Sequence, residues 1–219
     1  MKLDKHLKAK KEFVRLFFEE YRRRWKNIQS IHGNYPSEGL VLAYCFAEAM
    51  GYYRFGFSGS KLSSIEQFIK VLFEYQSNKR FFIIPPLAIK QLPVEKAKRT
   101  IGKKIKLEVL KWLKEHYPEA TSGVRIDLIW SFILKDLGGL LSESEKRQIG
   151  HLYQICWGGW YYDVIRTAGV HKAHFPKRTD EQDWIEINQA GTEILENLRT
   201  ECLDKIKFPH QLPQSDSII

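Results

Sequence analysis

The chain has 219 residues, with 35 Lys and Arg against 26 Asp and Glu, which gives a formal net charge of +9. Hydrophobic residues make up 43% of it and charged residues 28%, so a disordered or collagen-like chain is excluded. The length predicts a single domain over 1–210, with a basic N-terminal helix (1–34), a bundle core (35–208) and a flexible tail at 211–219. The positive charge permits a nucleic-acid partner without proving one.

The cysteines and the apolar segments indicate the compartment. The cysteines, Cys45, Cys156 and Cys202, are too few and too scattered for a disulfide framework or a Cys-based zinc site. The first 24 residues contain nine Lys and Arg and no apolar run, which is unlike a secretory signal. The most apolar stretch, Gly39 to Tyr53, is too short to span a bilayer and is interrupted by Glu48. We therefore expect a cytoplasmic protein that does not enter a membrane.

The first helices follow from the spacing of apolar residues. Residues 4 to 29 carry aromatic and aliphatic side chains at three- and four-residue steps, which predicts a basic amphipathic helix that ends near Gly33. Ser37 is a suitable N-cap for a second helix, about 38 to 52, that is apolar nearly all round. A helix of that kind is typical of the centre of a bundle.

Five further helices are expected. Ser63 or Ser64 caps the first, Ile65 to Tyr75, which a Pro-rich connector follows. In that connector, Phe81 to Ile84 has the composition of a short strand but no obvious partner. The other expected helices are a basic one at 94–117, an apolar one at 124–137, a very regular one after Ser142, and a last one near 192–207. The sequence therefore predicts an all-α bundle of six to eight helices.

The end of the regular helix contains an Arg-x4-His segment, Arg166 to His171. At about 100° per residue, Arg166 lies about 150° from the centre of the apolar stripe, so we expect it to face away from the core. Arg binds phosphate through two parallel donors, and His exchanges a proton near neutral pH. The two side chains converge only if the helix ends or distorts between them, which Gly169 allows. Chance occurrence of such a pair is the simpler alternative.

A second feature of that helix is its small-residue face. Gly158 and Gly159 lie in mid-helix, where each costs about 1 kcal/mol relative to alanine, on the same face as Tyr162 and Arg166. Such residues are kept where another backbone must come close. The neighbour is either another helix of the bundle or a second subunit, and in the second case Arg166 and His171 lie in a shared cleft.

The run from Tyr162 through Arg166, Gly169 and Val170 to His171 resembles the HEPN superfamily, whose catalytic members carry Arg-x(4 to 6)-His. The apolar helix that opens with Ser37 is similar to the first core helix of several bacterial families of this type. The resemblance covers roughly 35–205 and rests on six to eight residues. It implies an all-α, homodimeric, metal-independent endoribonuclease without a cofactor, with a role as a toxin or defence effector and a protein antitoxin as partner.

By that resemblance, His171 acts as general base on a ribose 2′-hydroxyl, and Arg166 holds the scissile phosphate, with a 2′,3′-cyclic phosphate end as product. Tyr162 and Thr167 have supporting roles, although Thr167 stands where Asn, Asp or His is commoner. The alternative is a non-catalytic module of the same family that binds RNA, a nucleotide or a protein partner.

Other polar residues also suggest roles. Glu48 lies in an otherwise apolar helix, so it requires a partner, either a structural Arg on a neighbouring helix or Arg166 itself. Cys156 belongs to an apolar stripe and is expected in the core. No metal site is expected, because the histidines lack carboxylates at ligand spacing. A basic segment is either a solvated helix face or a track for the RNA backbone; its residues include Lys98, Arg99, Lys103, Lys104 and Lys106.

Overall fold

The fold is described from a computed structural model, which describes residues 2–56, 62–84 and 181–213 continuously. Between 108 and 170 it describes only separate positions, the longest run being 162–167. The chain divides into two compact units. Unit 1 contains Met1–Asn78 and Tyr162–Ser217, and unit 2 contains Lys79–Tyr161 with Ile218–Ile219.

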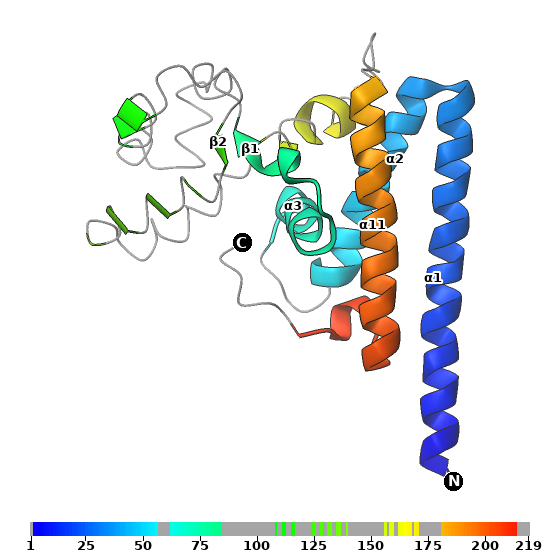
Figure 1. The fold of residues 1–219 in the computed structure, drawn as a ribbon. Helices are drawn as coiled ribbons and strands as arrows, with labels where there is room; N and C mark the ends of the chain where they lie inside the picture. The colour runs from blue at the N-terminus through cyan, green and yellow to red at the C-terminus, as the bar shows by residue number, and fades with distance from the viewer. Residues whose placement is uncertain are drawn as a thin grey trace. The chain divides into compact units, whose positions relative to one another are not determined.

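Unit 1 is a helical bundle. Its long helices are α1 (Lys2–Asn34) and α11 (Glu181–Lys205), which run side by side in Figure 1. The shorter helices are α2 (Pro36–Gly51) and α3 (Ser64–Tyr75). These are four α-helices with bounds in the described residues, fewer than the six to eight expected for the whole chain. The all-α class is confirmed.

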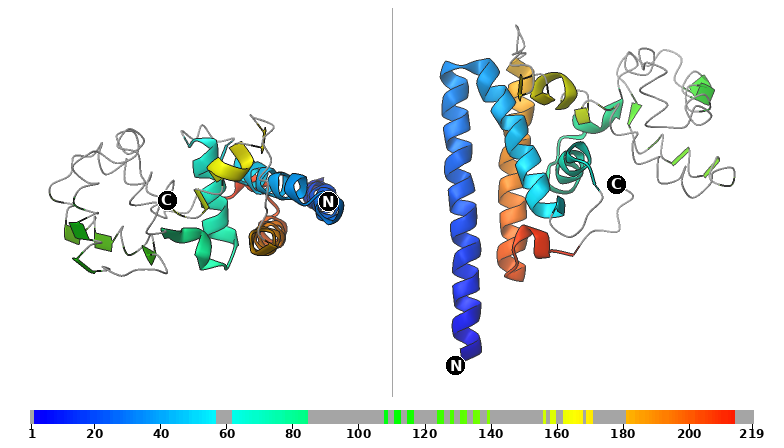
Figure 2. Two further views of the ribbon diagram at one scale, coloured as in Figure 1. Left: turned by 90° about the horizontal axis from the view of Figure 1, so that it is seen from above. Right: turned by 180° about the vertical axis from the view of Figure 1, so that it is seen from behind.

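The central helix is α2, as its all-round apolar sequence predicts. It packs against α1, α3 and α11, and Figure 2 shows it next to α1 and α3. Its fully buried residues include Leu40, Ala43, Tyr44, Ala47 and Met50. Burial of a large apolar side chain stabilises a fold by about 1.5–3 kcal/mol, so this helix supplies much of the core of unit 1.

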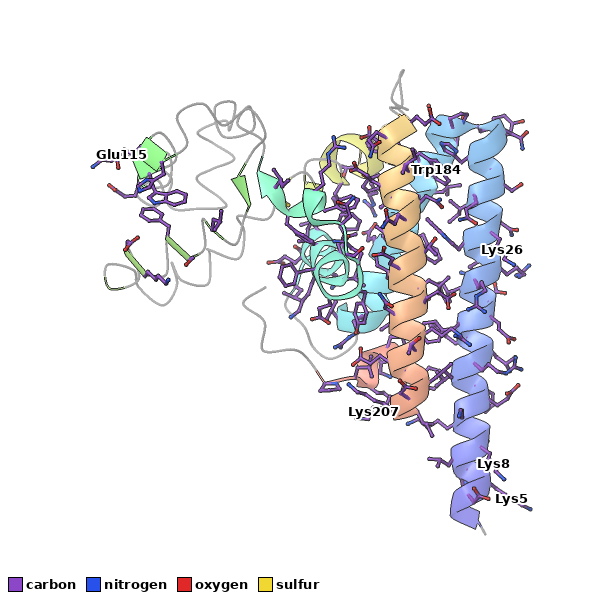
Figure 3. All side chains as sticks on the ribbon, in the orientation of Figure 1. Lys5, Lys8, Lys26, Glu115, Trp184 and Lys207 are labelled. Carbon is purple, nitrogen blue, oxygen red and sulfur yellow. The ribbon has the colours of Figure 1, made fainter. Side chains whose placement is uncertain are left out.

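Short irregular helices complete unit 1. The π-helical turn η1 (Tyr52–Gly56) continues directly from α2, and a second π-helical turn, η6 (Tyr162–Thr167), packs against α2. The chain then passes from α11 into the 3-10 turn η7 (Pro209–Gln211), which packs against η1. At the other end of the bundle, His32 of α1 stacks on Trp184 of α11 with ring centroids 3.6 Å apart, and Figure 3 labels Trp184.

Several predicted boundaries were wrong. Helix α1 continues to Asn34, so Gly33 lies inside its last turn and does not end it. Helix α2 begins at Pro36, with Tyr35 as its N-cap, instead of after Ser37. Helix α11 begins at Glu181, 11 residues before the expected start, in a segment whose polarity had suggested a loop. The acidic residues Glu181 and Asp183 in its first turn favour a helix through its dipole.

Unit 2 contains the only strands among the described residues. Strand β1 (Ile83–Ile84), which follows the 3-10 turn η2 (Lys79–Phe82), pairs antiparallel with β2 (Val124–Arg125). The expected short strand therefore has a partner, and the helix predicted to start at Val124 starts later. Cys156 is fully buried, as expected of a core cysteine, and burial raises the pKa of its thiol to about 12.

Candidate functional site: the Glu48–Arg166 cluster

An acid, an arginine and a tyrosine come together where η6 meets α2. The Nε atom of Arg166 donates a hydrogen bond to Oε2 of Glu48 at 2.6 Å, and Nη2 donates to Oε1 at 3.0 Å. The hydroxyl of Tyr162 donates to the same Oε1 at 2.8 Å. This two-pronged arrangement is the strongest form of an Arg–carboxylate pair. We call these three residues the Glu48–Arg166 cluster.

The cluster lies at the edge of the core. The Arg166 and Glu48 side chains are 19% and 13% exposed, and Tyr162 is buried. The expectation that Arg166 faces away from the core is therefore wrong. It assumed the regular advance of an α-helix, whereas residues Tyr162–Thr167 form a π-helical turn, whose i→i+5 bonding changes the direction of each side chain.

The Tyr162 ring lies against the arginine and is itself packed on a second ring. The Arg166 guanidinium carbon lies 5.3 Å from the centroid of the Tyr162 ring, within the range of a cation–π contact. The Tyr162 ring packs in turn on Phe68 of α3, with centroids 5.2 Å apart. Ser64, the first residue of α3, also hydrogen-bonds to the Tyr162 side chain. The position of Arg166 is thus set by α2 and α3 together.

The electrostatics of the cluster keep the arginine charged and the tyrosine neutral. Burial alone lowers the pKa of Arg166, but its Tyr162 and Glu48 neighbours outweigh burial and the net pKa is raised. Burial and the Glu48 carboxylate both raise the pKa of Tyr162, so its hydroxyl remains a donor at neutral pH. An arginine in this setting is a permanent cation with a fixed direction.

A glycine allows the chain after η6 to lie close to α2. A side chain at Gly169 would meet a Val41 methyl at 2.6 Å, so η6 and its continuation approach α2 more closely than another residue allows. Val170 follows with 49% of its surface exposed. Thr167 lies half-buried at the end of the π-helical turn.

The structure thus brings together three of the residues that the sequence singled out. Glu48 has its arginine partner, and the partner is Arg166. His171 and the basic residues 98, 99, 103, 104 and 106 lie outside the described residues. The cluster of Glu48, Tyr162 and Arg166 is therefore observed, while the roles of His171 and the basic residues stay predictions.

Sequence reasoning missed Cys45, which also borders the cluster. It is one helical turn before Glu48, a spacing that places both on one face of α2. Burial raises the pKa of the Cys45 thiol, and the nearby Arg166 opposes that rise through its charge and a hydrogen bond. The thiol is half-buried and remains protonated at neutral pH.

The helix α2 carries an apolar, solvent-facing sector beside the cluster. Leu42 and Tyr52 are 38% and 48% exposed, and Cys45 and Ala49 are half-buried between them. Leu42, Cys45 and Ala49 of α2 and its C-cap Tyr52, the first residue of η1, recur at three- and four-residue steps, so they form one stripe. We call Leu42, Cys45, Ala49 and Tyr52 the α2 stripe.

In the described part of the chain, no group of three or more His, Cys, Asp or Glu is placed to hold a metal ion. None of its helices has both the length and the apolarity to cross a membrane. No protein-family model, no curated protein and no solved structure matches this chain.

Proposed function

We propose that this protein is a metal-independent endoribonuclease of the HEPN type. The observation that supports it most is that the arginine of the Arg-x4-His segment is held rigidly by the Glu48 carboxylate and the Tyr162 ring. A guanidinium fixed in advance loses little entropy when it binds a phosphate. A solvated surface arginine has no such preparation.

In the proposed reaction, His171 removes the proton from a ribose 2′-hydroxyl and the 2′-oxygen attacks the adjacent phosphorus. The bond from phosphorus to the 5′-oxygen breaks, and that oxygen takes up a proton. The products are a 2′,3′-cyclic phosphate end and a 5′-hydroxyl end. Arg166 holds the phosphate and stabilises the negative charge that it gains in the transition state. Thr167 and Tyr162 support the arginine, and no metal or cofactor takes part.

A homodimer is part of the proposal. The α2 stripe runs along the Glu48–Arg166 cluster and exposes apolar side chains that a second subunit would cover. Val170, between Arg166 and His171, is exposed as well. A dimer through this surface places the Arg-x4-His segments of two chains near one another. A toxin or defence role, with an antitoxin or other protein partner, would fit such an enzyme.

The second candidate is a non-catalytic module of the same type that binds RNA, a nucleotide or a protein. One observation favours it: Glu48 already balances the charge of Arg166. In that case the pair only fastens η6 to α2. The two candidates predict different results in the same assay.

The assay measures cleavage of a mixed-sequence RNA by the purified chain in EDTA. Arg166→Ala and His171→Ala should each reduce the rate at least 100-fold, while circular dichroism shows a folded protein. Arg22→Ala is the matched control, because Arg22 forms a similar inter-helix pair with Glu196 of α11 away from the cluster. Absence of cleavage by the wild-type chain on all RNAs tested would favour the non-catalytic module.

The dimer is tested separately by light scattering after gel filtration. Leu42→Lys in the α2 stripe should convert the dimer to a monomer and reduce cleavage. Leu16→Lys is its control, because Leu16 is a comparably exposed leucine on α1. If the wild-type chain is a monomer and still cleaves RNA, the shared-cleft arrangement is contradicted.

A further inference from the structure

Three aromatic rings in unit 2 form a parallel stack. The Trp112 ring stacks on Phe132 with centroids 4.8 Å apart and an angle of 14° between planes. The same indole stacks on His116 at 5.1 Å and 26°. Core aromatic pairs commonly prefer offset or edge-to-face contacts, as several rings of unit 1 do. We call Phe132, Trp112 and His116 the ring stack.

The ring stack reaches the surface. His116 is exposed, and Trp112 and Phe132 are half-buried. Leu128, in the same unit, is 41% exposed. The side chains drawn around Glu115 in Figure 3 belong to this part of the molecule. An aromatic stack that ends at an exposed ring presents a flat surface on which a further ring can lie.

The exposed ring is also fixed in orientation. His116 lies four residues after Trp112, both are helical, and its Nδ1 is 3.0 Å from the Trp112 carbonyl oxygen. A carbonyl oxygen only accepts, so Nδ1 carries the hydrogen and donates it. The imidazole is thereby held over the indole, with 26° between the two planes, without a ligand. This lowers the entropy lost when another ring stacks on it.

The charge of unit 2 identifies the class of ligand. Residues 79–161 contain fifteen Lys and Arg and eight Asp and Glu, a net charge of +7, which leaves +2 for the rest of the chain. Near the ring stack the charges are mixed, with Lys111 and Lys135 exposed alongside Glu115 and Asp136. The unit as a whole therefore attracts a polyanion, while the ring stack itself offers a flat aromatic surface.

We propose that the ring stack is a binding platform for an unpaired base of single-stranded RNA. Proteins bind single strands by combining basic surfaces with aromatic side chains on which bases stack. A duplex offers no such base, because its bases already stack within the helix. As a substrate site, the platform rests on the proposed ribonuclease function, whereas the binding itself does not.

The test is binding of a fluorescent 12-nucleotide 2′-O-methyl RNA to the full chain, measured by anisotropy. The methyl group blocks the 2′-oxygen, so the probe is not cleaved by the proposed reaction. We expect His116→Ala to weaken binding roughly tenfold, because one base–aromatic stack is lost. His116→Phe, which keeps a ring, should restore most of the affinity. Leu128→Ala, which removes an exposed apolar side chain without a ring, should leave binding unchanged.

A second arm compares the single strand with a 12-base-pair duplex of the same chemistry. We expect the single strand to bind more tightly and the His116→Ala effect to be absent for the duplex. Equal affinity for both forms, or unchanged binding by His116→Ala, would overturn the platform and leave only phosphate attraction. Binding with these ring effects in a chain that cleaves no RNA would contradict the ribonuclease and support the platform.

Discussion

Arg54 and Arg166 occupy two π-helical turns that both pack against α2. Arg54 is 3% exposed and lies against the Phe55 ring, as Arg166 lies against Tyr162. Its Nε donates to the Tyr75 hydroxyl at 2.9 Å, and Nη2 donates to the Pro213 carbonyl at 2.6 Å and lies 3.6 Å from Glu74. The partners of Arg54 thus come from α3 and from the segment after η7.

The difference between the two arginines lies in what binds them. Arg54 joins several parts of the chain through neutral oxygens as well as one acid, so it can change partners only if unit 1 opens. Arg166 binds the Glu48 carboxylate at the edge of the core, and its side chain is 19% exposed where that of Arg54 is 2% exposed. A phosphate can approach a group of the second kind without unfolding the bundle. We therefore assign a structural role to Arg54 and propose a functional one for Arg166.

The largest expected effect on stability comes from Arg54→Ala. It leaves Glu74 and the Tyr75 hydroxyl without their buried partner, which should lower the free energy of unfolding by about 3 kcal/mol or more. Urea denaturation followed by circular dichroism measures the loss. Arg22→Ala, at a more exposed pair, should cost less than about 1 kcal/mol. Equal losses of unfolding free energy in Arg54→Ala and Arg22→Ala would contradict the structural role assigned to Arg54.

Substitutions of Glu48 test whether this carboxylate contributes to stability, to RNA cleavage, or to both. Glu48→Ala leaves the Arg166 guanidinium without its carboxylate and should cost about 2 kcal/mol of stability. Glu48→Gln keeps a hydrogen-bond acceptor and should cost less, while still reducing RNA cleavage because the guanidinium is less firmly held. Both variants are compared by denaturation and by cleavage rate. Full activity in Glu48→Ala would show that Arg166 requires no support from α2.

The glycines beside the two turns provide a steric comparison. Gly51→Ala places a methyl against the backbone carbonyl of Gln67, which cannot move aside, and should cost about 1–2 kcal/mol. Gly169→Ala meets only the Val41 side chain and should cost less. Gly33→Ala is the control, since nothing lies within 4 Å of its new methyl, and it should stabilise α1 by up to about 1 kcal/mol. Thermal denaturation ranks the three variants, and a reversed order for Gly51 and Gly169 would contradict the comparison.

The smallest effect concerns pH and the network around Arg54. Burial acts to raise the pKa of Glu201, but hydrogen bonds from Lys205 and Tyr75 outweigh it, so the net pKa is lowered. The stability from this shift is therefore present above the ordinary glutamate pKa and is lost as the pH falls through the lowered value. Tyr75→Phe removes one of these bonds and should reduce the loss between pH 5 and pH 3 by less than about 1 kcal/mol. Denaturation at several pH values measures the change, and an unchanged pH profile would contradict it.

Local sequence signals predicted the helices well where side chains cap or pack. Ser63 and Glu66 form the capping box that begins α3, and the backbone N–H of Ser63 donates to Glu66 at 2.5 Å. The apolar sequence of α2 predicted its central place. An isolated acid in that helix required a partner, which allowed Glu48 to be matched with an arginine. These signals depend on residues close together in the sequence or on burial alone.

The π-helical turns were not predictable in the same way. They depend on tertiary packing against α2, and no residue pattern marked Tyr52–Gly56 or Tyr162–Thr167 as other than α-helical. Projection at α-helical spacing therefore predicted that Arg166 faces away from the core, whereas it binds Glu48 of α2. The boundary between the two units lies near the Pro-rich connector. Contacts such as Tyr162 with Glu48 join residues more than a hundred positions apart.

The central claim is that Arg166, held by Glu48, binds the scissile phosphate of RNA in a reaction without metal. The most direct measurement is the chemistry of the RNA ends after incubation with the wild-type and Arg166→Ala chains in EDTA. We predict 2′,3′-cyclic phosphate and 5′-hydroxyl ends from the wild type and almost none from a folded Arg166→Ala chain. Cleavage with the same ends and at the same rate by both chains would contradict the claim.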